Sequence, residues 1–201
     1  MFQKPVTPSY DQYIDFDSEF YNTGGSVEVL TLGFVRDDGE RLYLLNPEIQ
    51  RVKEKIAATA KDTWVMDNVL HPDILMAHNP IIPTNAEQMA HMVYDFCGRA
   101  PIFTTYCGAY DMVALRSLFG SMIEGPKDWR YTCLDLAHPL SMMGLRSRDF
   151  PQAGEELPEH NAMADALWTQ RVRRLLPQLA LNHSPEIATF VRLYLTSLKP
   201  R

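Results

Sequence analysis

The sequence has few cysteines and no pair of them at metal-binding spacing. Its three cysteines, Cys97, Cys107 and Cys133, are widely separated and form no C-x-x-C pair. An odd and scattered set predicts neither a disulfide framework nor a zinc cluster. We therefore expect a reducing, cytoplasmic setting.

Long apolar runs and an excess of basic residues are also lacking. No stretch approaches the roughly 18 apolar residues of a membrane-spanning helix, and the first residues, MFQKPVTPSYDQY, have no hydrophobic signal segment. We expect no membrane span. The formal net charge of -6 argues against a broad basic surface, so any contact with nucleic acid should be local and bridged partly by metal.

The apolar content is ample for a folded domain. With 201 residues, of which 46% are hydrophobic, the chain fits one domain with a substantial core. We expect residues 1–201 to form a single domain, with its core at about 13–176 and a C-terminal helix at about 184–198.

Hydrophobic periodicity predicts an antiparallel meander followed by alternating helices and strands. The expected strands are 13–20, 27–35, 41–45, 101–107 and 131–136. The expected helices are short ones between 47 and 70, then 84–97 with a capping box at Thr84 and Glu87, 110–120, 159–176 and 184–198. An irregular lead-in (1–12), a turn (21–25) and a loop (139–158) complete the chain. This order predicts an α/β domain with a mixed five-stranded sheet flanked by helices.

The first expected strand carries an unusual set of acids. In Tyr13-Ile14-Asp15-Phe16-Asp17-Ser18-Glu19-Phe20, alternate side chains share a face, so Asp15, Asp17 and Glu19 point the same way. Converging carboxylates repel one another on a half-buried surface, whereas a divalent cation converts the repulsion into ligation. The strand therefore predicts a metal site.

Two later segments supply further candidates. Asp111 lies in the first turn of a helix that follows a strand, and Asp165 lies in a late helix behind His160. Each alone has a structural explanation, because a helix start favours an acid and a histidine can cap a helix. Strand ends and helix starts of one sheet can nevertheless bring them together. The small side chain of Ala162, three residues before Asp165, is expected to leave room for an ion and a substrate.

Two further acids lie close to these candidates. Asp15 shares the face of Asp17, and Asp135 ends an expected strand. We expect both to be structural supports rather than metal ligands.

Taken in order, these segments resemble a known superfamily. Asp17-Ser18-Glu19, Tyr110-Asp111 and His160-Asn161-Ala162-Met163-Ala164-Asp165 resemble the three motifs of the DEDDh 3'-5' exonucleases, which have a ribonuclease H-like fold. More narrowly, FDSEFYNTGGSVEVLTLGFV, YCGAYDMVAL and HNAMADA resemble the family of the mycobacterial polyadenylate-specific exoribonuclease, RNase AS. The resemblance covers about residues 13–176.

The resemblance implies a site with two divalent ions, Mg²⁺ or Mn²⁺. Asp17 would bridge both ions, Glu19 and Asp165 would complete the first, and Asp111 would support the second, partly through water. His160 would be the general base that takes a proton from the attacking water.

Substrate contacts are expected next to these acids. Ser18 and Phe20 are candidates, and at the end of its strand Phe20 is expected to turn and stack on terminal bases or wedge between them.

The resulting prediction is a metal-dependent 3'-5' exoribonuclease that releases nucleoside 5'-monophosphates from the 3' ends of single-stranded RNA. The alternatives are a 3'-5' exodeoxyribonuclease of the same superfamily and a non-catalytic nucleic-acid-binding domain. The resemblance also implies a homodimer. The apolar stripe of the last helix is expected to pack on the body or on another subunit, and it comprises Ile187, Phe190, Val191, Tyr194 and Leu198.

Overall fold

The computed structural model describes residues 12–22, 27–59, 63–120, 123–150 and 159–199. Most of the expected lead-in, most of the turn at 21–25 and the second half of the loop at 139–158 lie outside these ranges. No helix within them is both long and apolar enough to cross a membrane.

The described strands form one mixed sheet. They are β1 (Tyr13–Asn22), β2 (Val27–Arg36), β3 (Arg41–Leu45), β4 (Ile102–Thr105) and β5 (Leu134–Asp135). The spatial order is β3-β2-β1-β4-β5. Strand β2 is antiparallel to both β1 and β3, whereas β4 is parallel to β1 and β5 is parallel to β4. The predicted five-stranded α/β sheet is confirmed. Only two residues of the expected strand at 131–136 pair with β4, so that prediction was too long.

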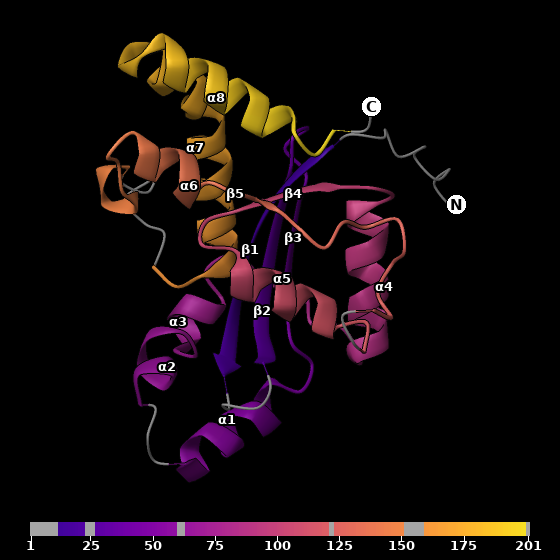
Figure 1. Cartoon of the computed structure of the whole chain (residues 1–201). Helices are drawn as coiled ribbons and strands as arrows, with labels where there is room; N and C mark the ends of the chain where they lie inside the picture. Colours follow the sequence, from indigo (N-terminus) through magenta and orange to yellow (C-terminus); the bar gives the residue numbers. More distant parts are fainter. Residues whose placement is uncertain (1–11, 23–26, 60–62, 121–122, 151–158, 200–201) are drawn as a thin grey trace.

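Helices cover both faces of the sheet (Figure 1). They are α1 (Ile49–Thr59), α2 (Thr63–Asn68), α3 (Pro72–Leu75), α4 (Ala86–Cys97), α5 (Ala109–Ser117), α6 (Ala137–Met142), α7 (Ala162–His183) and α8 (Pro185–Thr196), with a 3-10 turn η1 at Ser147–Asp149. The α4 and α5 side chains share one core cluster with the sheet, whereas α7 and the α1–α2 pair pack on the other face. The helices therefore form two layers, one on each face of the sheet.

Several helix boundaries differ from expectation, and α3 lies in a segment that was expected to be a loop. The N-cap of α4 is Asn85, which accepts from the Gln88 amide, so the capping residues lie one position after the predicted Thr84 and Glu87. The expected loop at 139–158 contains the end of α6 and all of η1. The helix predicted to end at 176 continues to His183 through Pro177, because its packing against the sheet and α8 outweighs the lost hydrogen bond.

The apolar stripe of α8 packs inside the chain. Val191 is fully buried in a cluster with Val172, Leu176 and Ala180 of α7, and Ile187 and Phe190 pack against it. The first of the two packing alternatives is therefore confirmed. The predicted homodimer stays a prediction.

A buried ion pair fixes β1 against α7. Arg173 donates two hydrogen bonds of 2.7 Å to Asp15, which is fully buried. The guanidinium also lies 4.4 Å from the centre of the Tyr13 ring. Burial raises the pKa of Asp15, and Arg173 offsets part of that effect. Asp15 thus meets a cationic side chain in the body of α7, as expected of a structural acid.

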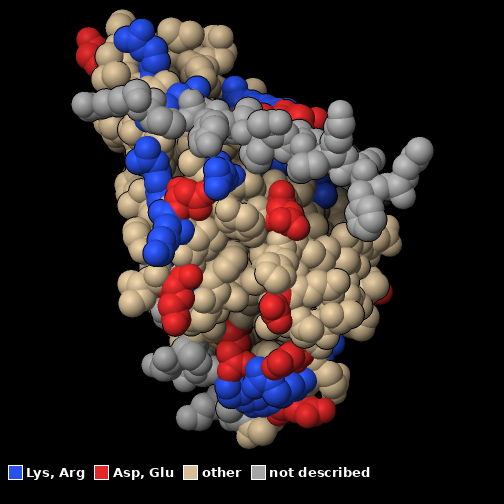
Figure 2. All heavy atoms as spheres, turned by 90° about the vertical axis from the view of Figure 1, so that its right-hand side faces the viewer, with Lys and Arg blue, Asp and Glu red and all other residues tan. Residues whose placement is uncertain are grey.

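The face that carries α4 has mixed charge. Lys and Arg lie beside Asp and Glu around a broad uncharged area, and the described residues form no continuous basic surface on it (Figure 2).

Candidate active site

Three predicted ligands meet at the start of α7. Asp17 and Glu19 project from β1 and Asp165 from the first turn of α7, and one carboxylate oxygen of each lies within 4.8 Å of the others. Three hard oxygen donors at this spacing suit Mg²⁺ or Mn²⁺. The chain therefore holds a group of donors that fits the predicted metal site.

A glycine allows α7 to come this close. Gly33 of β2 is paired with Asp17, and a Cβ atom on it would lie 2.2 Å from the Ala162 carbonyl oxygen. The backbone of α7 thus rests where a side chain of β2 would otherwise be. Sequence reasoning overlooked Gly33, although a glycine inside a strand is a signal of close backbone approach.

The carboxylates are unfavourable as anions without a cation. Burial is the largest cause of a pKa of Asp17 well above 3.8, and the carboxylates of Asp111, Asp165 and Glu19 add to it. Burial, followed by Asp165 and Asp111, raises the pKa of Glu19 from 4.5 to about 8. A bound divalent cation would reverse both effects, which is a second reason to regard the group as a metal site.

The metal-free chain should lose stability as pH rises. Unfolded Glu19 releases its proton near pH 4.5 and folded Glu19 only near pH 8, so rising pH favours the unfolded chain across this window. Mn²⁺ binds the ionised form and should stabilise more at pH 8 than at pH 5. At one hundred times its dissociation constant it should add about 2.7 kcal/mol, or about 5–10 °C in melting temperature.

Thermal denaturation with and without Mn²⁺ at several pH values measures this. Glu19→Gln should flatten the pH dependence of the metal-free chain. An Mn²⁺ effect of the same size at pH 5 and pH 8 would contradict the coupling.

Asp111 is held beside the group by Ser18. The Ser18 amide and hydroxyl donate to Asp111 Oδ1 at 3.0 and 2.6 Å, from the face of β1 opposite Asp17. Burial raises the pKa of Asp111 to about 6, although the Ser18 hydrogen bonds lower it. Ser18 is buried and its hydroxyl is engaged with Asp111, so this geometry favours positioning of Asp111 over the substrate contact expected for Ser18.

Asp135 supports the turn that presents Asp111. Its carboxylate accepts from the amides of Cys107 and Gly108, directly before α5, and from Ala137. These contacts agree with the structural role expected for Asp135.

His160 lies between the N-cap of α7, Asn161, and the ring of Trp64. Its backbone has a left-handed φ of 62°, and the next residue, Asn161, is the buried N-cap of α7 that accepts from the Met163 and Ala164 amides. The edge of its ring meets Trp64 of α2, with centroids 4.8 Å apart. The imidazole is thereby packed against Trp64, which sequence reasoning missed, and it lines the same cavity as Asp17 and Asp165.

A cavity of about 710 Å³ joins His160 to the carboxylates. Its lining residues include Asp17 and Asp165 together with the aromatic residues Tyr106, Phe150 and Trp168. The remaining lining residues are Ser147, Arg148, Glu159 and Thr169. Its volume and mixed lining suit a nucleotide-sized ligand.

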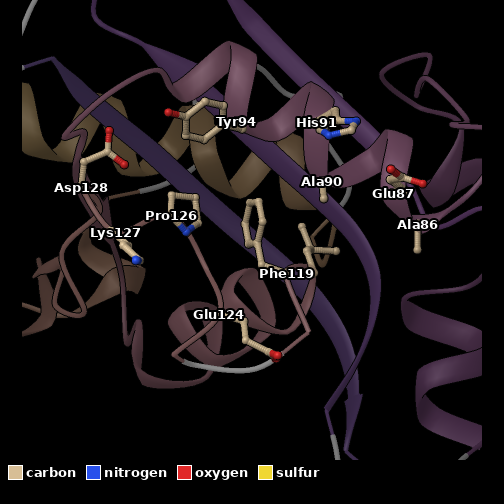
Figure 3. Close-up of a pocket in the computed structure, with 11 residues that line it drawn as sticks. Ala86, Glu87, Ala90, His91, Tyr94, Phe119, Glu124, Pro126, Lys127 and Asp128 are labelled. Carbon is tan, nitrogen blue, oxygen red and sulfur yellow. The ribbon is translucent and has the colours of Figure 1, made fainter.

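Another cavity, of about 630 Å³, lies on the α4 side of the molecule (Figure 3). Glu87, His91, Glu124 and Lys127 are among its lining residues, with Phe119 at its floor. It contains none of the predicted site residues. The cavity at the start of α7 is the one that three predicted site residues line: Asp17, His160 and Asp165.

The structure bears on the expected roles of Ala162 and Phe20. Ala162 is fully buried in a cluster with Val35 and Tyr43, so its small side chain serves packing and does not leave room for an ion. Phe20 stacks on Tyr110, with ring centroids 5.5 Å apart, and Tyr110 is the exposed partner of the pair. Contact between Phe20 and terminal bases stays a prediction.

Gly33→Ala should damage the site more than the fold. The added Cβ meets backbone atoms of α7 and must push Asp165 and His160 away from Asp17. A shift of about 1 Å in a catalytic group costs about 10²-fold in rate, and overpacking costs about 1–3 kcal/mol in unfolding free energy.

The matched control is Gly39→Ala. Gly39 has a φ of 90°, and no atom lies within 4 Å of the point that a Cβ atom would occupy, so alanine there strains a turn far from the site. It should lower stability and leave the rate of nucleotide release unchanged. A Gly33→Ala protein with the wild-type rate would refute the positioning argument.

Comparison with known proteins supports the fold. No family model matches the chain, and no curated protein matches it. Its structure is similar to that of E. coli exonuclease I in complex with a 5cy-dT13 oligonucleotide, with a TM-score of 0.52 and 15% sequence identity. The similarity covers 90% of this chain and 42% of that one. It concerns the fold and agrees with the predicted ribonuclease H-like architecture, whereas the narrower resemblance to RNase AS stays a prediction.

Proposed function

We propose that this protein is a metal-dependent 3'-5' exonuclease that releases nucleoside 5'-monophosphates. The observation that carries the proposal is the meeting of Asp17, Glu19 and Asp165 within 4.8 Å on a ribonuclease H-like sheet, where Asp17 and Asp165 line a cavity together with His160. Three half-buried carboxylates that repel one another are unfavourable without a bound cation, and a metal-dependent nuclease would supply that cation.

We assign different roles in the reaction to the carboxylates, Ser18 and His160. Asp17, Glu19 and Asp165 would hold the ions, and Asp111, which Ser18 positions by two hydrogen bonds, would support the second ion. Two divalent ions would supply charge stabilisation for the scissile phosphate and its leaving oxygen. His160 takes a proton from the attacking water, a role to which imidazole chemistry is suited near neutral pH.

RNA is the substrate we favour, because of the narrower sequence resemblance. DNA is the second candidate, favoured by the structural neighbour, which was solved with a dT13 oligonucleotide. Discrimination between them depends on contacts with the 2'-hydroxyl.

The test compares 5'-labelled RNA and DNA strands of one sequence, each with Mn²⁺, Mg²⁺ or EDTA. We expect stepwise shortening from the 3' end with either metal and none with EDTA. Faster cleavage of DNA would overturn the RNA assignment. No metal-dependent cleavage of either strand would overturn the nuclease proposal and favour a binding domain.

A further inference from the structure

One wall of the cavity is built by the segment around η1. Trp168 of α7 donates from Nε1 to the Phe150 carbonyl oxygen at 2.6 Å, and its ring meets Tyr106 edge to face. Trp168 lies three residues after Asp165, on the same side of the helix. The helix that presents a metal ligand therefore also fixes the end of η1 beside the cavity.

Arg148 gives this wall a charge that the rest of the cavity lacks. Among the described residues that line the cavity, it is the only lysine or arginine, whereas Asp17, Glu159 and Asp165 are acidic. Arg148 is exposed and makes no ion pair or side-chain hydrogen bond with any other described residue. A guanidinium is the group best suited to bind phosphate oxygens, and this one has no partner within the described part of the chain.

We propose that Arg148 binds the second phosphate from the 3' end of the strand, which lies on the 5' side of the scissile linkage. The inference rests on the proposed nuclease function. The scissile phosphate belongs beside Asp17 and Asp165, and Arg148 is not within ion-pair distance of either carboxylate. A single nucleotide unit separates neighbouring phosphates, and the cavity of about 710 Å³ extends from the acids to the η1 wall.

The test is a chemical double-mutant cycle. One strand carries a neutral methylphosphonate at the second linkage from its 3' end, and the reference strand is unmodified; only release of the first nucleotide is counted. The wild type should lose about tenfold in kcat/KM on the modified strand, as for one charge-assisted hydrogen bond. Arg148→Gln should lose the same factor on the unmodified strand and be indifferent to the modification.

The controls separate this subsite from general effects. Arg146→Gln removes an exposed arginine that does not line the cavity, and it should behave as wild type. A methylphosphonate at the sixth linkage should have no effect. Arg148→Gln should also reduce the salt dependence of log kcat/KM by about 0.7, the amount for one phosphate contact on a single strand.

Three outcomes would overturn the subsite. The first is a wild type that is indifferent to the neutral second linkage, and the second is an Arg148→Gln protein that still distinguishes the two strands. The third is an equal loss for Arg148→Gln on a chromogenic nucleoside ester with a single phosphodiester, which would place Arg148 on the scissile phosphate. If the wild-type protein cleaves neither strand, the nuclease proposal itself is overturned, and the subsite with it.

Discussion

Asp17→Asn is expected to abolish metal-dependent nucleotide release while making the metal-free protein more stable at pH 8. The carboxylate lies within 4.8 Å of those of Glu19 and Asp165, and asparagine removes its charge at nearly constant volume. Loss of a metal-held Lewis acid costs several kcal/mol in the transition state, so the rate should fall by about three orders of magnitude or more.

The gain in stability follows from the same carboxyl group. Its pKa in the folded chain is raised well above 3.8, so at pH 8 ionisation favours the unfolded chain more than the folded one. An asparagine has no such pH dependence. Melting temperatures in EDTA should therefore be higher for the variant at pH 8, and the stabilisation by Mn²⁺ should be lost.

The matched control is Asp95→Asn, which makes the same change of charge on the exposed face of α4. It should leave both the rate and the effect of Mn²⁺ unchanged. An Asp17→Asn protein that retains Mn²⁺ stabilisation would show that Asp17 is not a ligand.

The sequence predicted the parts of the site that depend on local periodicity. The alternation along β1 places Asp17 and Glu19 on one face, and the N-cap at Asn161 marks the start of the helix that presents Asp165. Both features are set within a few residues of the chain, so they are visible without the fold.

Periodicity does not separate Asp15 from Asp17, which share that face. The separation comes from the path of α7 across the sheet: its first turn brings Asp165 to Asp17, and a turn eight residues later brings Arg173 to Asp15. Which residue of α7 meets which residue of β1 depends on the path of the helix across the sheet, and no local pattern specifies that path.

Other features depend on contacts between distant segments. Gly33 matters because of the Ala162 backbone, and the η1 wall is fixed by a hydrogen bond from Trp168. Trp64 lies in a part of the chain whose periodicity is weak, and its contact with His160 joins two segments far apart in sequence. A glycine inside a strand signals a close backbone approach but does not identify the partner, and the contacts of Trp64 and Trp168 have no sequence signal at all.

His160→Asn is expected to slow the chemical step by about 10²–10⁴-fold, the range for loss of a general base. Asparagine is chosen because it tolerates the left-handed backbone that His160 adopts, at a φ of 62°. Asn161 remains as the N-cap, so Asp165 should keep its position. The variant should therefore bind Mn²⁺ and a strand as tightly as the wild type.

Single-turnover rates and strand binding in the same buffer separate the two effects. A matched variant is Trp64→Ala, which keeps the imidazole of His160 but removes the ring that packs against it. Because a mispositioned base still transfers protons, Trp64→Ala should lose less rate than His160→Asn, and the double variant should lose no more than His160→Asn alone. Additive losses would mean that Trp64 acts on the substrate directly, and a weaker affinity for Mn²⁺ in His160→Asn would place the histidine among the ligands.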